Sequence, residues 1–182
     1  MKKLFATLLT LALLFALASC AKKPEPVATP ESVTIKGEQY GTDLTQLNLS
    51  KKDLADTDIE PLKYMTNLQS LDLGGNNITD LSPLSGLTTL GSLTLSQNNI
   101  TDVSPLSGLT SIWSLSLDMN KVSDISPLSE LTNLQRLTLP ANNISDLTPL
   151  SKLTNLTLLR LQGNPVTDWS PVAHIADVVG RP

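Results

Sequence analysis

The sequence has very few of the side chains that catalytic and metal sites most often use. Among its 182 residues there is one histidine, His174, and one cysteine, Cys20. Phe, Trp and Tyr together make up only 3% of the chain, whereas leucine occurs 37 times. These shortages exclude a metal cluster of cysteine and histidine, a disulfide framework, and a catalytic triad that needs a second histidine. We therefore expect no enzymatic activity, no cofactor and no small-molecule substrate, and we expect His174 to lie at the surface.

The N-terminal stretch has the pattern of a secretory signal peptide. Two lysines precede an apolar run over 4–17, which is shorter than the roughly 20 residues of a membrane-spanning helix. The next step, Leu-Ala-Ser-Cys at 17–20, resembles the lipobox of bacterial lipoproteins, in which the peptide is cut before the cysteine and that residue is acylated. The resemblance implies export, lipidation of Cys20, and anchoring to the bacterial cell membrane or outer membrane. An ordinary signal peptide followed by a chance cysteine is the alternative.

The overall charge argues against two classes of ligand. The formal net charge is −4, and removal of the signal peptide would take away two lysines and no acid. Nucleic acids and anionic bilayer surfaces attract proteins with an excess of Lys and Arg. We therefore expect no nucleic acid as a partner and membrane association only through the lipid anchor.

From Leu68 onward the sequence repeats itself every 22 residues, and an imperfect copy that is two residues longer precedes this from Leu44. Leucines recur in the pattern L-x-x-L-x-L, and one asparagine follows in each of the later copies but not in the first: Asn76, Asn98, Asn120, Asn142 and Asn164. The full string, L-x-x-L-x-L-x-x-N-x-I-x-D-L-x-P-L-x-x-L, resembles the leucine-rich repeat in its short form, as found in bacterial internalins. The resemblance covers residues 44 to about 175.

The alternation of leucine with polar residues independently predicts short strands with one buried face. Such strands cannot bury their leucines alone, so consecutive repeats must stack and pair in parallel. We expect an α/β solenoid in the form of a right-handed arc, with about six parallel strands on the concave face. On the convex face we expect one 3₁₀ turn per repeat at Ser-Pro-Leu, capped by the serine. The expected segments are a signal peptide (1–19), a lipid-anchored Pro-rich tether (20–31), an N-terminal cap (32–43), the repeat domain (44–172) and a C-terminal cap or tail (173–182).

Two columns of polar residues have competing interpretations. The resemblance implies that the asparagines point inward and bond backbone groups of adjacent turns, which makes them a structural ladder. A column of acids precedes each Ser-Pro or Thr-Pro step: Asp80, Asp102, Asp124, Asp146 and Asp168. Either each carboxylate caps its own loop, as aspartate often does in turns, or the column binds calcium. We favour capping because no second carboxylate accompanies each acid.

If the recurring columns are structural, recognition must come from the variable positions of the concave face. These positions are small and polar in the N-terminal half, whereas the other half offers Trp and Arg, which dominate binding hot spots. As an alternative, Trp113 packs beside Gly91 as a lid over the strands. The sequence predicts a protein that binds another protein through this face; a structural or envelope-assembly spacer that associates end to end is the alternative. The candidate contact residues are Trp113, Asp118, Met119, Arg136, Leu158 and Arg160.

Overall fold

The computed structural model describes residues 30–181. The expected signal peptide, the lipidation site Cys20 and most of the expected tether lie outside the described residues. The described chain begins with a hairpin of β1 (Ser32–Ile35) and β2 (Glu38–Gly41), paired antiparallel. Val33 and Ile35 are buried, so the hairpin covers the first repeat with apolar side chains.

A second sheet contains seven strands in sequence order, all parallel. The register sets equal positions of consecutive repeats side by side, as Leu71 beside Leu93 shows. Each of the first six strands therefore buries its central leucine and turns its two flanking residues outward. The strands are β3 (Gln46–Asn48), β4 (Ser70–Asp72), β5 (Ser92–Thr94), β6 (Ser114–Ser116), β7 (Arg136–Thr138), β8 (Leu158–Arg160) and β9 (Asp177–Val179).

The expectation of about six strands is therefore one too low. The seventh strand, β9, comes from the segment expected to form only a cap or tail. Val178 pairs with Leu159 and takes the place of the repeat leucine, so a shortened repeat still adds one strand. The period of the leucines hides this strand because the spacing changes in the last repeat.

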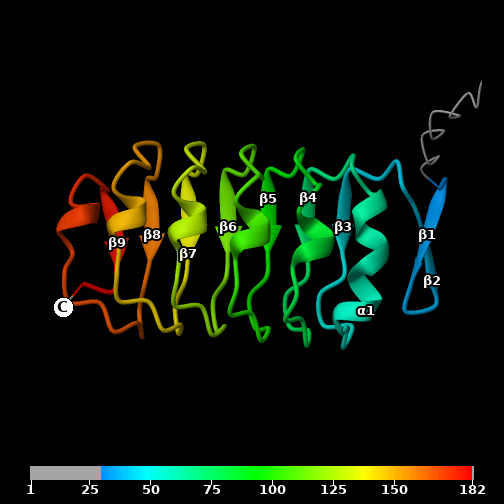
Figure 1. The fold of residues 1–182 in the computed structure, drawn as a ribbon, viewed down its shortest axis with the longest axis horizontal. Coiled ribbons are helices and arrows are strands. Elements are labelled where there is room, and N and C mark those ends of the chain that lie inside the picture. The colour runs from blue at the N-terminus through cyan, green and yellow to red at the C-terminus, as the bar shows by residue number, and fades with distance from the viewer. Residues whose placement is uncertain (1–29, 182) are drawn as a thin grey trace, which may run out of the picture.

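Short helical turns run along the opposite side of the coil from the strands (Figure 1). The first repeat has a longer helical segment than the others because it contains extra residues. The turns are α1 (Asp56–Ile59), η1 (Glu60–Tyr64), η2 (Ser82–Leu84), η3 (Ser104–Leu106), η4 (Ser126–Leu128), η5 (Thr148–Leu150) and η6 (Ser170–Val172). The predicted solenoid of short parallel strands and 3₁₀ turns is confirmed.

The predicted cap of each 3₁₀ turn is wrong in its residue. In η2 the serine is already the first helical residue, Leu81 precedes it, and no side chain of the residue before the turn caps it. The aspartate two positions before the serine does this work instead: Asp80 accepts hydrogen bonds from the Ser82 backbone N–H and hydroxyl, both at 2.8 Å. A carboxylate has two oxygens and can receive both donors at once.

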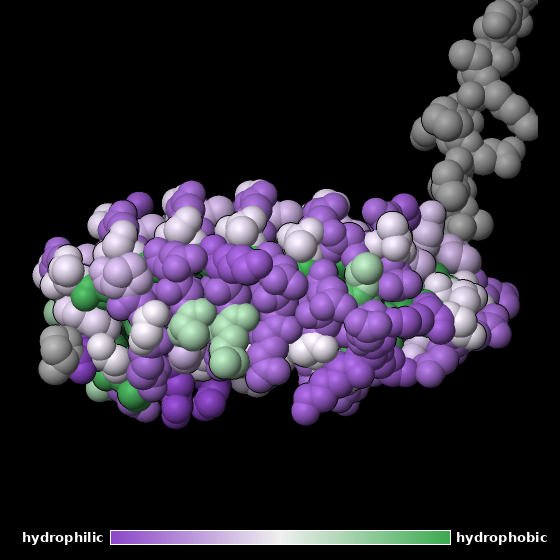
Figure 2. All heavy atoms as spheres, turned by 90° about the horizontal axis from the view of Figure 1, so that it is seen from below, coloured by the Kyte–Doolittle hydropathy of each residue, from purple (hydrophilic) through white to green (hydrophobic). Residues whose placement is uncertain are grey.

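The core is a continuous aliphatic column inside the coil. Leucines of the strand, loop and helical turn converge in every repeat, and Leu95, Leu117 and Leu139 have no exposed surface. No single repeat encloses these side chains, so stability depends on contact between neighbours. The outside differs: the side of the coil in Figure 2 is largely hydrophilic, with only small separate apolar patches. No helix among residues 30–181 is both long and apolar enough to cross a membrane.

Candidate functional site: the outer face of the sheet

The asparagine ladder fills the interior next to the sheet. The Asn120 carbonyl oxygen accepts the backbone N–H of Ile100 at 3.0 Å, and its amide nitrogen donates to the carbonyls of Leu95 and Leu117, each at 3.0 Å. Asn98 and Asn142 repeat this arrangement one turn earlier and one turn later. Each amide links two adjacent turns and is buried, so these side chains hold the coil together and are not open to a ligand on the surface.

The aspartate column makes local hydrogen bonds at the helical turns. Asp102 accepts from the Ser104 backbone N–H at 2.8 Å and hydroxyl at 2.9 Å, as Asp80 does with Ser82. Backbone and hydroxyl hydrogen bonds from Ser126 and Ser170 lower the pKa of Asp124 and Asp168, and those from Thr148 lower the pKa of Asp146. These are the bonds of the capping interpretation. Among residues 30–181 no group of three or more His, Cys, Asp or Glu is placed to hold a metal ion.

These caps should make the fold less stable at low pH, where the aspartates become protonated. Because folding lowers the pKa of Asp124, Asp146 and Asp168 below 3.8, their stabilisation is complete above that value and is lost as the pH falls further. We expect the melting temperature to decline below about pH 4. The triple variant D124N/D146N/D168N should decline less over the same range, as thermal melts in a pH series would show. Equal acid sensitivity of the two proteins would contradict the capping role.

We call the outward-facing residues of β3–β9, with the loop residues directly beside them, the strand face. Its N-terminal half is small and polar, and its other half carries the two arginines. Arg136 lies beside Leu158, and Arg160 lies beside Thr138 on the neighbouring strand. Both arginines are exposed, and neither forms an ion pair with another of the described residues. The structure thus brings Arg136, Leu158 and Arg160 together on two adjacent strands.

The sequence analysis offers two interpretations of Trp113, a contact residue for a partner or a lid beside Gly91, and its position in the structure agrees in part with each. Its indole lies over Gly91, where a Cβ atom would come within 2.7 Å of the indole nitrogen, Nε1. Even so, 44% of Trp113 is exposed, and with Met119 at 57% it is one of two large apolar residues exposed within 30–181. The absence of a side chain at Gly91 therefore allows the edge of the indole to approach the sheet closely while much of the ring stays exposed.

We expect Gly91→Ala to displace the Trp113 indole with little loss of stability. The added methyl group would overlap the ring edge, but the ring is near the surface and free to move, so the cost should be below about 1 kcal/mol. In a W169F background, Trp113 is the single tryptophan, and its fluorescence emission should shift to longer wavelength. An unchanged emission spectrum would contradict the described packing.

Asp118 and Met119 differ from the other candidate contact residues. The Asp118 carboxylate accepts hydrogen bonds from Thr138 and from Ser116, the latter at 3.3 Å, so the strand face itself uses it. Met119 has a left-handed backbone with φ of 55°, a conformation that Gln97 and Ala141 share at the same point of their repeats. This conformation turns the chain out of the sheet just before each ladder asparagine, and the Met119 side chain is exposed there.

The N-terminal half of the strand face is hollowed, which the sequence does not reveal. The Trp113 hollow, with a volume of about 470 Å³, is lined by Gln46, Gln69, Ser70, Thr89, Gly91, Ser92 and Trp113. Small side chains at adjacent positions create this space, and the indole closes one side of it. Only the register of the strands shows that residues so far apart in sequence share one concavity.

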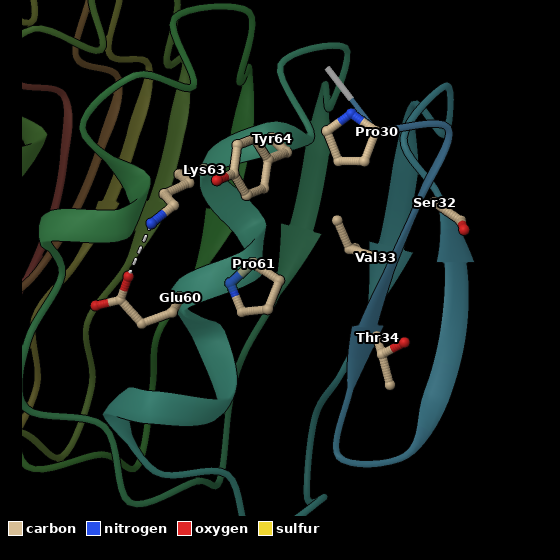
Figure 3. A pocket seen from close by; sticks show the side chains of 8 residues that line it. All are labelled: Pro30, Ser32, Val33, Thr34, Glu60, Pro61, Lys63 and Tyr64. Carbon is tan, nitrogen blue, oxygen red and sulfur yellow. Dashed lines mark hydrogen bonds and ion pairs between the residues drawn. The ribbon is translucent and has the colours of Figure 1, made fainter. Parts of the chain in front are cut away.

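A second hollow lies at the N-terminal end, between the hairpin and η1 (Figure 3). Pro30 and Val33 face Pro61 and Tyr64 across it, and Lys63 forms an ion pair with Glu60 at 3.3 Å beside it. His174 lies near the other end of the coil, exposed, with its Nε2 atom 3.3 Å from the Leu153 carbonyl oxygen. Neither place adds a residue to the strand face.

Comparisons with known proteins agree with this architecture. The family described as Leucine Rich repeats (2 copies) matches residues 66–108 and 132–174. A search of curated proteins by sequence gives no significant match. Among solved structures, an internalin (inlF) from Listeria monocytogenes is 39% identical, with a TM-score of 0.72 over 78% of this chain and 43% of the internalin. The chain therefore has the leucine-rich repeat fold and is similar to bacterial internalin-type proteins.

Two further structures extend the comparison. A leucine-rich repeat protein from Leptospira interrogans is 27% identical, with a TM-score of 0.69 over 75% of this chain and 37% of that protein. A plant peptide hormone receptor in complex with RGF2 is 23% identical, with a TM-score of 0.65 over 77% of this chain and 25% of the receptor, and it supports the fold alone. The chain spans less than half the length of each of these three proteins.

Proposed function

We propose that this leucine-rich repeat domain binds another protein through the C-terminal half of its strand face and has no enzymatic role. The observation that carries the proposal is the pair of arginines on adjacent strands, exposed and without an ion pair among the described residues. Trp113 and Met119, before and after β6, add exposed apolar surface beside the strand that carries Arg136. Elsewhere in the described coil, large apolar side chains are buried or half-buried, so this combination marks the surface that gains most from being covered.

The partner surface should be acidic and contain apolar or aromatic side chains. A guanidinium pairs with carboxylates through two parallel hydrogen bonds, and each arginine has five N–H donors for such bonds. Leu158 lies beside Arg136 and is only half-buried, so it supplies an apolar contact next to the charge. Leucine-rich repeats are commonly used for protein binding, and the receptor solved in complex with RGF2 is one example of the fold bound to a ligand.

The triple variant W113A/R136A/R160A tests this proposal. We expect it to fold normally and to lose capture of the partner from an envelope extract, because hot-spot truncations each weaken binding by about 2 kcal/mol or more. The matched control W169F/K63A/K152A removes two cations from the helical turns and alters the other tryptophan, and it should capture the partner as the parent chain does. Equal capture by the triple variant and the parent would overturn the proposal, as would equal loss in the control.

We further propose that the chain is exported and held at the membrane through lipid on Cys20. The support is the signal-like sequence that ends in the chain's single cysteine. Several acyl chains at one site anchor a protein stably, since each buried CH₂ contributes about 0.8 kcal/mol. Mass spectrometry of the native protein should find an acylated N-terminal Cys20, and Cys20→Ser should release the chain from membranes. An unmodified Met1 would overturn this part.

End-to-end association is the second candidate, and the last strand favours it. Within residues 30–181, β9 has a strand partner on one side only, and Val178 and Val179 are half-buried. Unpaired strand edges promote pairing between chains. Light scattering over a concentration series would then show a mass that rises with concentration; a constant monomer mass would exclude this candidate.

A further inference from the structure

The Trp113 hollow differs from the rest of the strand face in its unused hydrogen-bonding capacity. The side-chain amides of Gln46 and Gln69 and the hydroxyls of Ser70 and Ser92 bond to no other group of residues 30–181. Two strands further on, comparable side chains bond one another instead: Ser96 and Ser116 at 2.7 Å, and Thr138 and Ser116 at 2.9 Å. Thr89 also lines the hollow, but its hydroxyl lies 2.7 Å from each of the Thr66 and Leu68 carbonyls and donates to them. The two glutamines and two serines are therefore left to bond solvent or a ligand.

The uncharged lining of the hollow favours uncharged ligands over charged ones. Among the residues that line the hollow there is no Lys, Arg, Asp or Glu. A phosphate, a nucleotide or a charged peptide would gain no ion pair there to offset the water that it loses. Amides and hydroxyls can each both donate and accept hydrogen bonds, so they match a ligand whose own polar groups do both.

The backbone under the hollow gives no opening for an added peptide strand. Strands β4 and β5 form hydrogen bonds with a neighbour on each side, so their N–H and C=O groups are occupied. A peptide that binds as a strand needs a free sheet edge. A ligand in the hollow meets side chains, the backbone of Gly91 and the half-exposed Trp113 indole, and it adds no strand to the sheet.

We propose that the Trp113 hollow binds an uncharged oligosaccharide. A sugar ring has an apolar face of C–H groups that covers an indole, and a rim of hydroxyls that donate and accept. Trp113 supplies the first surface, and the glutamines and serines supply partners for the second. The hollow is shallow and open, so we expect a dissociation constant of about 1 mM. The hollow shares Trp113 with the proposed protein-binding surface but does not include the arginines, so R136A/R160A separates sugar binding from protein binding.

The two tryptophans of the chain provide the readout. The full chain, held in a detergent without a sugar headgroup, is titrated with maltotriose and with chitotriose while the indole N–H signals are followed by NMR. The W169F variant assigns the two signals. With at least one sugar, the Trp113 signal should shift and saturate with a dissociation constant of about 1 mM, and the Trp169 signal should stay in place.

Two variants separate the hollow from the rest of the face. S70A/S92A keeps the fold but removes two hydroxyls from the lining, and it should weaken binding about fivefold or more. R136A/R160A leaves the hollow intact and should bind the sugar as the parent does. The proposal is overturned if neither sugar moves the Trp113 signal at about 10 mM, if S70A/S92A binds unchanged, or if an uncharged tripeptide produces the same shift.

Discussion

Asn120→Ala should lower the free energy of unfolding by about 2 kcal/mol or more. The substitution leaves the buried N–H of Ile100 without its acceptor among the described residues. It also removes one of two amide donors from each of the Leu95 and Leu117 carbonyls, which keep the donors from Asn98 and Asn142. A buried polar group left without a partner costs about 1–3 kcal/mol, and each lost hydrogen bond adds about 0.5–1.5 kcal/mol. Urea denaturation followed by circular dichroism measures the change, with the midpoint moving at a nearly constant slope.

A surface asparagine gives the matched control for this experiment. Asn133 is exposed and donates a single hydrogen bond, to the Thr110 carbonyl at 2.8 Å, in a position that water reaches. Asn133→Ala should therefore cost less than about 1 kcal/mol. A loss at Asn120 no larger than the loss at Asn133 would show that the ladder does not hold the turns together.

Leu159→Ala should destabilise the fold by about 2–5 kcal/mol, whereas Leu158→Ala in the same strand should change stability by less than about 1 kcal/mol. Leu159 has no exposed surface and lies in the aliphatic column, so truncation leaves a cavity between two repeats. Leu158 is only half-buried and faces outward from β8. Chemical denaturation of both variants compares one residue type on two sides of one strand.

The Leu158 variant also links stability to binding. Since Leu158 lies beside Arg136 on the strand face, its truncation should weaken partner capture while the protein stays folded. The reverse outcome, with Leu158→Ala unfolding the chain and Leu159→Ala tolerated, would mean that the inside and outside of the sheet have been assigned the wrong way round.

The buried residues can be predicted well from the sequence because the same apolar positions recur in every repeat. Leu71, Leu93 and Leu115 occupy one position in successive turns, and one physical requirement, burial against the next turn, explains all three. The capping serine was a wrong prediction, because serine and the acid two positions before it can both serve a turn. Geometry alone shows that Ser82 is already inside η2 and that Asp80 receives its donors.

The surface is harder to predict because each of its positions occurs once. The hydrogen bond from Thr138 to Asp118 depends on the register between two neighbouring strands. The spacing of residues along the sequence does not predict such a contact between side chains. The Trp113 hollow forms because Gly91 and the neighbouring serines have small side chains. Such residues form no sequence pattern that predicts a cavity. Strand β9 is hard to predict from the sequence for a related reason, since Val178 occupies the position where the repeat would place a leucine.

Oxidative footprinting tests the central claim, that recognition uses the strand face while the repeat columns stay inside. Met119 is 57% exposed and Trp113 44% exposed, whereas Met65 has no exposed surface and serves as the internal standard. In the free chain, hydroxyl radicals should oxidise Met119 and Trp113 quickly and Met65 slowly, as mass spectrometry would show. With the captured partner bound, Met119 and Trp113 should become protected while Trp169 keeps its rate. Protection of Trp169 with Met119 and Trp113 unchanged would contradict the claim.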